Sequence, residues 1–576
     1  MIIVKQWTML LSFNKLIFYI LFIAQALAQH HAPVRFSLKS TASDSFFTNG
    51  LSSNIVAEIR LLGDSLTWLG TGQGLAFHDG HKVYSHNTTL DSLGNNTLTN
   101  LVPVGGIPSI SVDGEKIVVS YSGDNGSIQV GYGLTYADLS SYNDSSSINW
   151  TYLQQPMDDS EEDTLVQFFG EGSFNMLPVT VKEANVTYDS QLLNDTLYTA
   201  SWAGGLRRYH MNAGFWENVP MPMDSQDSLS TCEGFVDDGL GRKIKQGYFL
   251  NPRDPGDGGN HNHKAFSVLL VPSPDFAISD TIWVGTANGI NRGEIIRTRE
   301  PGAGPGGTDK ITRCIEWVHY RFPEDGLSGN FVVGLAKQNW NNRTTIWAAT
   351  MNADSQGETR GLSYTRDGGE TWKSTLLGER IYNVYAKDSL VLASSQSGLW
   401  KSFDGVNWAI FEPAIDKTFL SQSQILTDIV YTSVLDQRDT TQLLWIGTSD
   451  GLAYSTDLNG GNWKIFQTEY DADQFYAYPN PFSPFNHNQL GSEGYVRFHT
   501  GSIANREVKL EIFNFAMEKV FDKVFSLDSY NGALKWDGRD LNGNYVSNGV
   551  YFIKMNYSQS ANKSPQDYWN KLIVVK

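Results

Sequence analysis

Short runs of β-branched and aromatic residues recur along the chain, separated by turns rich in glycine, asparagine and serine. Three runs belong to one repeated phrase, which reads TWLGTGQGL from Thr67, IWVGTANGI from Ile282 and LWIGTSDGL from Leu444. In each phrase the apolar residues around the tryptophan favour a buried strand, Gly-Thr ends that strand, and the later glycine begins the next. The phrase therefore predicts a strand, a tight turn and a second strand.

Four looser copies of the phrase lie between the full ones, which brings the number of units to seven. The copies are KIVVSYS from Lys116, TLYTASWAGGLRRY from Thr196, TIWAAT from Thr345 with GLSYTRDGGETW from Gly361, and LVLASSQSGLW from Leu390. The units are spaced roughly 45 to 85 residues apart, which is typical of four-stranded propeller blades of about 40–50 residues with inserted loops. We therefore predict an all-β fold, with a seven-bladed β-propeller at residues 29–468 and a small Ig-like β-sandwich at residues 491–576.

Two further stretches indicate where the innermost strands begin. NGLSSNIVAEI, from Asn49, precedes the first phrase, and DGLSGNFVVGL, from Asp325, precedes the fifth unit. A β-solenoid or a pair of β-sandwiches would also be all-β, but neither readily explains units near 45 residues. The sequence leaves open whether the ring closes with a strand from the segment after Gln29 or from its C-terminal end alone.

The pattern GL, N-x-V and LWIGT-x-x-GL resembles the two-component-regulator type of propeller repeat, most closely in units one, five and seven. TRDGGETW, at Thr365–Trp372, is similar to the Asp-box or BNR turn of sialidase, sortilin-type and photosystem-assembly propellers, and Ser402–Trp408 and Ser455–Trp463 are variants of it. We expect its aspartate and glycine to build an outer hairpin and its tryptophan to pack between neighbouring sheets. The residues given this structural role are Asp367, Gly369, Trp372, Asp404, Trp408, Asp457 and Trp463.

Beyond Phe466 the prolines of YAYPNPFSPFNHNQ predict a linker at residues 469–490. Alternating apolar and polar residues then resume in GYVRFHT, REVKLEIFNFAMEKVF and GVYFIKMNY, as in the strands of a small sandwich. This tail resembles the FlgD-like immunoglobulin fold and, more closely, the type A C-terminal sorting domain of the type IX secretion system. The resemblance rests on Tyr478, Pro479, Asn480, Pro481, Phe482, Trp536, Asp537, Gly538, Asn542, Gly543, Gly549, Tyr551 and the last six residues, Lys571–Lys576.

The resemblance implies a protein of a Gram-negative bacterium that is secreted or held at the outer cell surface, with the secretion machinery as a partner of the tail. It leaves open whether the tail is later removed. The N-terminus agrees with export, because residues 1–28 combine Lys5 and Lys15, an apolar run and the ending Ala26-Leu27-Ala28, which together are typical of a cleaved signal peptide. An ordinary Ig-like domain at the end of the chain is the alternative, since folds are reused without their function.

Charge and cysteines exclude several classes of function. The net charge of −18 becomes −20 when Lys5 and Lys15 leave with the signal peptide, and so acidic a protein repels nucleic acid and anionic lipid. No later apolar stretch is long enough to span a membrane. The only two cysteines, Cys232 and Cys314, do not form a zinc motif, and we predict that they form one disulfide, which counting free thiols after denaturation would test.

No enzyme motif occurs: a Gly-x-Ser-x-Gly elbow, a His-Glu-x-x-His helix, a phosphate loop and a dinucleotide fingerprint are all absent from the sequence. No catalytic residue, cofactor or metal is therefore predicted. Carboxylates from different blades could still converge as in glycosidases, but nothing selects a pair among the 61 acidic residues. His261 and His263, within the long excursion Asp224–Lys264, are only weak candidates for metal ligands.

The sequence predicts an exported propeller that acts as a monomer and binds an extracellular carbohydrate or protein without turning it over. Aromatic residues at the rim of the channel would stack against sugar rings. A polysaccharide hydrolase or lyase is the main alternative, and it requires two convergent carboxylates, or a Tyr or His with a charge-neutralising group, on one face. Sialidase activity is not expected, because the Arg-Ile-Pro of sialidases has only Gly106-Ile107-Pro108 as its counterpart. A sensor ectodomain is disfavoured, because no transmembrane helix or kinase segment follows the propeller.

Overall fold

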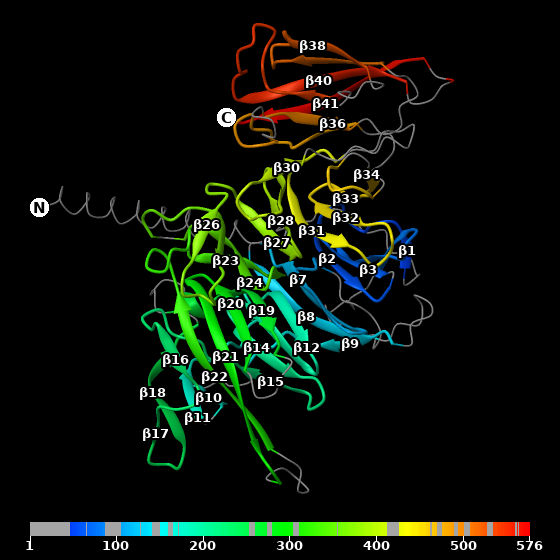
Figure 1. Cartoon of the computed structure of the whole chain (residues 1–576). Helices are drawn as coiled ribbons and strands as arrows, with labels where there is room; N and C mark the ends of the chain where they lie inside the picture. The colour runs from blue at the N-terminus through cyan, green and yellow to red at the C-terminus, as the bar shows by residue number, and fades with distance from the viewer. Residues whose placement is uncertain are drawn as a thin grey trace, which may run out of the picture.

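The chain folds almost entirely into strands (Figure 1). The computed structural model describes residues 47–576, with gaps at 65, 87–104, 127, 141–149, 159–164, 171, 253–259, 274–278, 303–309, 354, 412–424, 461–462, 469–474, 489–493, 500–506, 527–533, 559–561 and 563. The predicted signal peptide and the segment after Gln29 up to residue 46 lie outside this part of the chain. Within it, none of the helices has the length and apolar character needed to cross a bilayer. The all-β prediction is confirmed.

Seven antiparallel sheets follow one another around a ring, and we number them as blades 1 to 7 in chain order. Blade 1 holds β2 (Val56–Leu62), β3 (Leu66–Thr71), β4 (Gly74–His78) and β5 (Val83–His86), with β1 (Phe47–Asn49) outermost; blade 2 holds β6 (Ile110–Asp113), β7 (Lys116–Asp124), β8 (Gln129–Asp138) and β9 (Thr151–Leu153); blade 3 holds β12 (Thr187–Leu193), β13 (Thr196–Ser201), β14 (Gly205–His210) and β15 (Phe215–Asn218). Blade 4 holds β19 (Ala265–Val271), β20 (Asp280–Thr286), β21 (Gly289–Glu300) and β22 (Lys310–Tyr320), with β16 (Ser228–Ser230) outermost; blade 5 holds β23 (Phe331–Trp340), β24 (Arg343–Met351), β25 (Gly361–Thr365) and β26 (Lys373–Thr375). Blade 6 holds β27 (Ile381–Lys387), β28 (Leu390–Ser395), β29 (Gly398–Ser402) and β30 (Ala409–Phe411); blade 7 holds β31 (Val430–Asp436), β32 (Leu443–Thr448), β33 (Gly451–Ser455) and β34 (Trp463–Phe466).

The innermost strands close the ring. Each of β2, β6, β12, β19, β23, β27 and β31 contacts the next, and β31 contacts β2. Each repeat unit of the sequence falls on the second strand of a blade. The propeller prediction is therefore confirmed.

The repeated phrase brings its blade close to the next one. In blade 7, a Cβ at Gly447 would lie 2.5 Å from the carbonyl oxygen of Val56 in blade 1. The corresponding distances from Gly70 and Gly285 to a carbonyl oxygen at the start of the next blade are 3.0 and 2.5 Å. No side chain fits in this space, because interiors are close-packed.

The threonine after that glycine shapes the turn. Thr448 Oγ1 donates to the carbonyl of Gly451 at 2.8 Å and accepts the N–H of Asp450 at 3.0 Å. Gly451 has φ of 124°, which only glycine adopts readily, and its N–H donates to the carbonyl of Asn54 ahead of blade 1 at 2.5 Å. Thr71 and Thr286 make the same two hydrogen bonds in their own turns. The repeated phrase therefore joins each of these blades to the next one.

The seam between blades 7 and 1 closes without an exchanged strand among the described residues. β1 pairs with β5 at the outer edge of blade 1, and the four strands of blade 7 follow one another in the chain. Arg438, just after β31, pairs with Asp436 at 2.8 Å and reaches across the seam. Its acceptors in blade 1 are the carbonyl oxygens of Leu62 at 3.0 Å, Gly63 at 3.2 Å and Leu66 at 2.6 Å, and Oγ1 of Thr67 at 3.0 Å.

A further sheet stands outside the ring and packs into the hydrophobic cluster shared by blades 3 and 4. Its strands are β10 (Leu165–Phe169) and β11 (Gly172–Met176), from the connection before blade 3, and β17 (Phe235–Asp237) and β18 (Lys243–Leu250), from the connection after it. β11 and β18 pair in parallel, so the two connections meet outside blade 3. The structure joins Cys232 to Cys314 of β22 by a disulfide, which attaches the second connection to blade 4.

The tail forms a β-sandwich beside blades 6 and 7 (Figure 1). One sheet holds β35 (Tyr476–Tyr478), β36 (Val496–His499) and β39 (Lys535–Trp536); the other holds β38 (Lys519–Ser526), β37 (Glu507–Phe513), β40 (Gly549–Tyr557) and β41 (Gln566–Val574). The two sheets share one core, to which Phe482 and Trp536 contribute. The described part of the predicted linker at residues 469–490, residues 475–488, is thus part of the sandwich, because it holds β35 and the core residue Phe482.

Candidate functional site

Six of the seven innermost strands share an irregularity near their first residue. Pairing with the second strand of the blade skips one residue in β2, β12, β19, β23, β27 and β31, whereas β6 pairs without a shift. The skipped residues are Ala57, Tyr188, Phe266, Val333, Tyr382 and Tyr431. A β-bulge of this kind re-aims a side chain. Because innermost strands of a propeller run in the same direction, these residues gather at one end of the channel.

Four of the bulge residues are aromatic, and their rings touch those of neighbouring blades. The centroid of Phe266 lies 5.7 Å from that of Tyr188 and 5.5 Å from that of Trp202. Tyr382 and Tyr431 lie 5.1 Å apart in blades 6 and 7. Trp202 and Tyr431 are half-buried, and the other three rings are buried. We call these five residues the aromatic mouth.

Two acidic residues of the innermost strands interact electrostatically, Glu58 on β2 of blade 1 and Asp189 on β12 of blade 3. Burial raises the pKa of Glu58 to about 7, with Arg60 opposing and Asp189 adding to the shift. Burial also raises the pKa of Asp189 to about 6. Glu58 forms an ion pair with Arg60 at 2.7 Å, and Asp189 accepts the N–H of Val268 at 2.9 Å. A carboxyl group with a pKa near 7 can give or take a proton at neutral pH.

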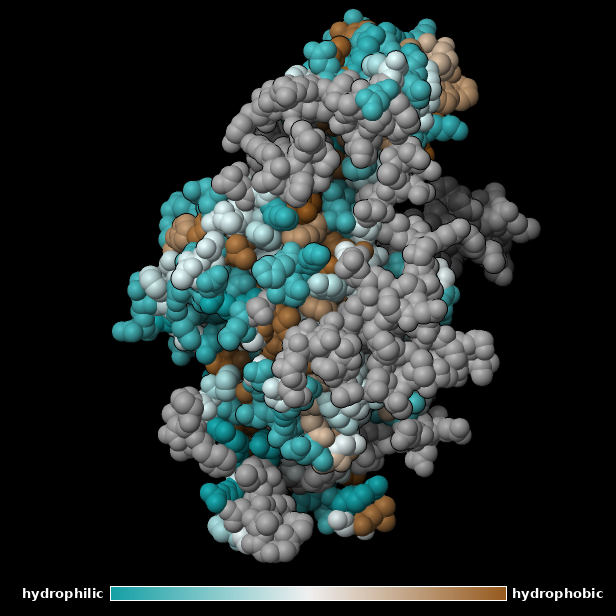
Figure 2. All heavy atoms as spheres, turned by 90° about the vertical axis from the view of Figure 1, so that its right-hand side faces the viewer, coloured by the Kyte–Doolittle hydropathy of each residue, from teal (hydrophilic) through white to brown (hydrophobic). Residues whose placement is uncertain are grey.

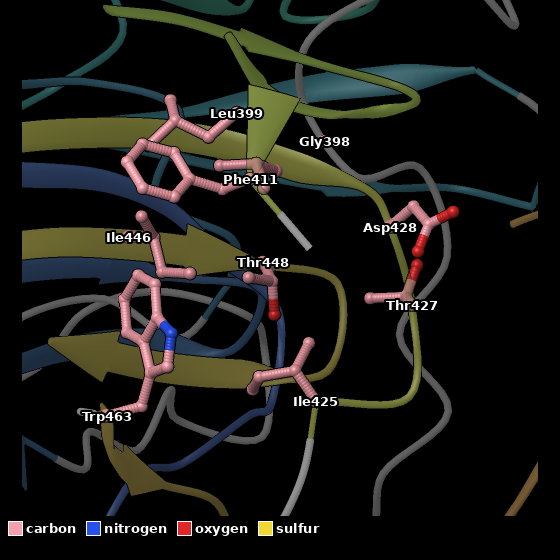
Figure 3. A pocket seen from close by; sticks show the side chains of 10 residues that line it. Gly398, Leu399, Phe411, Ile425, Thr427, Asp428, Ile446, Thr448 and Trp463 are labelled. Carbon is pink, nitrogen blue, oxygen red and sulfur yellow. The ribbon is translucent and has the colours of Figure 1, made fainter. Parts of the chain in front are cut away.

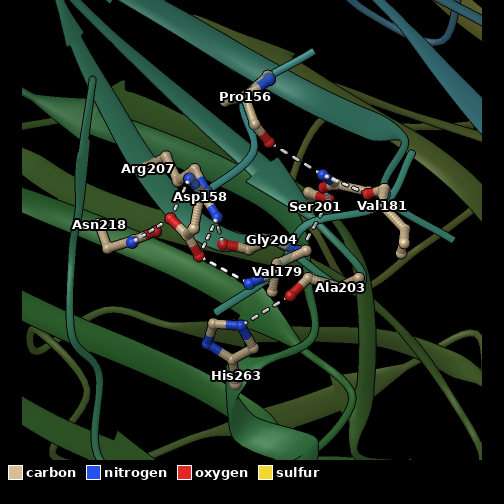
Figure 4. Close-up of polar contacts among 11 residues, drawn as sticks. Pro156, Asp158, Val179, Val181, Ser201, Ala203, Gly204, Arg207, Asn218 and His263 are labelled. Atoms are coloured by element: carbon tan, nitrogen blue, oxygen red, sulfur yellow. Dashed lines mark hydrogen bonds and ion pairs between the residues drawn. The ribbon is translucent and has the colours of Figure 1, made fainter. Parts of the chain in front are cut away.

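A buried network anchors the connection between blades 2 and 3 (Figure 4). Arg207 of β14 forms two bonds to Asp158, at 3.0 and 3.2 Å, and both side chains are almost fully buried. Asp158 also accepts from Asn218 at 3.0 Å and from the N–H of Val179 at 2.7 Å. With four bonds made, this carboxylate is occupied by structural contacts.

His263 belongs to the same region, and its role is structural. Its Nε2–H donates to the carbonyl of Ala203 at 3.0 Å (Figure 4). Burial lowers its pKa to about 4, which keeps the ring neutral. His261 and His263 share one short 3-10 turn, and no group of three His, Cys, Asp or Glu able to hold a metal occurs in the described ranges.

The three Asp-box turns join the third and fourth strands of blades 5, 6 and 7. Asp367 accepts from the hydroxyl and N–H of Thr371, at 2.6 and 2.9 Å, and these bonds lower its pKa to about 2. Asp404 accepts two backbone N–H groups at 2.8 Å, which hold its pKa well below the ordinary value, and Asp457 accepts the N–H of Asn459 at 2.8 Å. Gly369 has φ of 105°, and its N–H donates to Thr365 at 2.9 Å.

The tryptophans of these turns contact the preceding blade. Trp372 lies 6.0 Å from Trp283 of blade 4 in an edge-on arrangement. Trp408 lies 6.3 Å from Trp347 of blade 5. Trp463 is buried in the cluster between blades 6 and 7. The three tryptophans therefore pack neighbouring blades against each other and do not form a ligand site.

A small cavity lies in that last cluster (Figure 3). Leu399 and Phe411 of blade 6 and Ile446 and Trp463 of blade 7 line it. Its polar lining is engaged elsewhere, since Thr448 donates to a backbone carbonyl and Asp428 pairs with an arginine of the sandwich. The cavity is a packing space and not a candidate ligand pocket.

Residues of the predicted sorting motif build one edge of the sandwich. Asn480 accepts the N–H of Ile573 at 3.0 Å, and Phe482, fully buried, donates to the carbonyl of Ile573 at 2.7 Å. Pro479 and Pro481 follow cis peptide bonds in the same segment, residues 478–482. This segment is therefore hydrogen-bonded to β41, the last strand of the sandwich.

The remaining motif residues lie in or around the sandwich core. Trp536 is buried, and its Nε1 donates to the carbonyl of Arg539 at 2.8 Å, while Asp537 accepts the N–H of Arg539 at 3.0 Å. Tyr551 is buried, and the N–H of Lys576 donates to a side chain ahead of β40 at 2.9 Å. The two glycines, Gly538 and Gly549, lie in the turn after β39 and at the start of β40.

The sequence analysis expected aromatic residues at the channel rim but identified none of the five residues of the aromatic mouth, and it missed the pair of Glu58 and Asp189. Both depend on contacts between blades that are far apart in the sequence. One signal was present: five of the seven innermost strands carry an aromatic residue close to the strand start, and in four of them it is the bulge residue.

No protein-family model matches the chain, and neither does any curated protein. Among solved structures it is similar to PorZ, a surface component of the type-IX secretion system of Porphyromonas gingivalis, at 12% identity, with 90% of this chain and 66% of that chain covered and a TM-score of 0.31. It is also similar to YCF48 from Cyanidioschyzon merolae, at 11% identity, 73% and 99% coverage and a TM-score of 0.36. A third likeness is to the extracellular domain of a hybrid two component system from B. thetaiotaomicron, at 11% identity, 92% and 99% coverage and a TM-score of 0.16. Values this low assign neither a family nor a function to the chain.

Proposed function

We propose that this chain is an exported propeller that binds an extracellular carbohydrate at the aromatic mouth and does not turn it over. The observation that carries the proposal is the set of aromatic rings placed by successive bulges at one end of the channel. Trp202 and Tyr431 keep part of their rings exposed there, and such rings offer flat apolar faces with polar neighbours for orientation.

Binding of the full chain to a panel of polysaccharides, measured by affinity electrophoresis, tests this proposal. Trp202→Ala is expected to weaken binding about tenfold, because loss of one aromatic contact costs about 1 kcal/mol or more. Trp340→Ala is the matched control, because this exposed tryptophan ends β23 and so lies at the opposite end of the channel. Retention of proteins but of no polysaccharide would show a protein ligand instead.

The pair of Glu58 and Asp189 favours a second candidate, a polysaccharide hydrolase or lyase. Mass spectrometry of polysaccharides incubated with the full chain separates the two candidates. Shortened or unsaturated oligosaccharides that disappear with Glu58→Gln would establish catalysis. Polymers that bind but stay intact would support the binding module, in which Glu58 is held by Arg60.

We further propose that the sandwich carries the signal for type IX secretion, as its motif residues suggest. Fusion of residues 475–576 to a periplasmic reporter, in a host with that system, is expected to bring the reporter to the cell surface. Deletion of Lys571–Lys576 from the fusion should keep the reporter in the periplasm. Equal surface amounts with and without these six residues would contradict the proposal.

A further inference from the structure

An ion pair buried between the sandwich and the propeller joins the two parts. Arg497 of β36 lies 3.3 Å from Asp428 in the connection into blade 7, and their side chains are 5% and 1% exposed. Arg497 also donates to the carbonyl of Ile425 at 2.8 Å. Charges this deeply buried are tolerated only when paired, so removal of Arg497 would take the oppositely charged group away from a buried carboxylate.

The sandwich also completes the backbone hydrogen bonds of this connection. Asn488, itself buried, accepts the N–H of Asp428 at 3.0 Å and donates to the carbonyl of Leu426 at 3.4 Å. Asn488 donates in addition to Tyr495 at 3.0 Å, so one side chain ties both parts. Buried backbone groups that lose such a partner destabilise the fold.

A third contact reaches the aromatic mouth. Tyr478 of β35 donates to Oγ of Ser449, which lies in the turn of the phrase LWIGTSDGL, at 3.2 Å. Ser449 directly follows Thr448, and Thr448 pairs with Val430, the residue before Tyr431 of the mouth. The side of the mouth formed by blades 6 and 7 is thus bounded by the sandwich.

We infer that the sandwich is a permanent part of the propeller and not a detachable tail: the mature protein keeps residues 475–576 docked through Arg497, Asn488 and Tyr478, where they form a fixed wall beside the aromatic mouth. Figure 1 shows the sandwich next to the strands of blades 6 and 7. The inference does not depend on which ligand binds.

Mass spectrometry of the protein recovered from the surface or medium of the cells that make it tests retention directly. Peptides from β41, ending at or near Lys576, are expected in the mature form at the same abundance as peptides from blade 1. A mature form that ends before Phe475 would overturn the inference.

Hydrogen exchange of the full chain tests docking. Arg497→Met is expected to speed exchange of the N–H of Asp428 about a hundredfold or more, because one partner of a buried pair is lost. Lys519→Met is the matched control, since Lys519 pairs with Asp522 on the exposed side of the sandwich, and it should leave that exchange unchanged. Should Arg497→Met fail to fold, Tyr478→Phe offers a milder variant, with faster exchange expected around Ser449. Exchange at the wild-type rate at Asp428 and around Ser449 in the folded variants would overturn docking. This result would count against docking whatever the outcome of the carbohydrate experiments.

Discussion

Glycine at one position of the repeated phrase sets the distance between neighbouring blades. Gly70, Gly285 and Gly447 all lie where a carbonyl oxygen of the next blade occupies the space of a Cβ. The tryptophan two positions earlier is fully buried in each phrase. A small residue and a large one thus alternate along the second strand, and both are needed for close packing.

Gly447→Ala should lower the free energy of unfolding by about 2 kcal/mol, because overpacking against a backbone atom cannot be relieved by a side-chain rotation. Gly334→Ala is the control, since a Cβ there meets nothing closer than 3.5 Å. Urea denaturation of the two variants checks the difference. Equal stability of both would show that the blades separate freely at this point.

Glu58 gives the stability of the propeller a dependence on pH. Its pKa is raised from 4.5 to about 7 in the folded protein, so its favourable contribution is complete below pH 4.5 and is lost as the pH rises through 7. Glu58→Gln should therefore gain stability relative to wild type between pH 5 and pH 8, by up to about 3 kcal/mol. Denaturation at several pH values measures this gain, with Glu294→Gln, at a half-exposed ion pair, as the matched control for the substitution. A flat difference for Glu58→Gln would contradict the burial described.

Single residues show where prediction from the sequence succeeds. The turn residues Gly369 and Asp367 were predictable, because their hydrogen bonds lie within five positions of the chain. The distant partners of Arg438 and Arg497 were not, because the carbonyl of Leu66 and the carboxylate of Asp428 lie 372 and 69 positions away from them in the sequence.

Elements of the propeller are held together by the hairpins at their outer edge. The Asp-box turn of blade 5 places Trp372 against Trp283 and Tyr320 of blade 4. The contact is apolar and buried, so its contribution follows from the area that leaves water.

Trp372→Ala should lower the free energy of unfolding by about 3–5 kcal/mol, since it opens a cavity between two blades. Trp340→Ala, in the same blade but 44% exposed, should cost far less. Thermal unfolding by calorimetry compares the two. Similar melting temperatures would indicate that the turn moves to fill the cavity.

The positions of the strands could be predicted from local sequence patterns, whereas the strands with which they pair could not. The strand-turn-strand of each phrase was visible because glycine and threonine mark its ends. The parallel pair β11 and β18 was hidden, because the strands come from two excursions with a whole blade between them. The bulges were hidden too, since register is set by the neighbouring strand.

The ring closes at the contact between blades 7 and 1, and these blades exchange no strand among the described residues. Arg438 carries four hydrogen bonds from blade 7 to blade 1, and its charge is balanced by Asp436. The coloured part of the face drawn in Figure 2 is mainly hydrophilic, with smaller hydrophobic areas, in keeping with the net charge of −18.

Arg438→Met should lower the free energy of unfolding by about 3 kcal/mol, because several carbonyl groups lose a charged donor. Hydrogen exchange is expected to rise first in blades 1 and 7 and to stay low in blades 3 and 4. Arg242→Met, at an exposed pair, serves as the control. Uniform changes around the ring would show that the seam is no weaker than other blade contacts.

The sheet outside blade 3 has an evolutionary consequence. Its two hairpins are inserted on either side of one blade, and each supplies the other with a partner strand. Loss of either hairpin would leave the survivor with an open edge, which favours aggregation. We expect natural variants of this protein to gain or lose the pair together, and the two cysteines with the second hairpin.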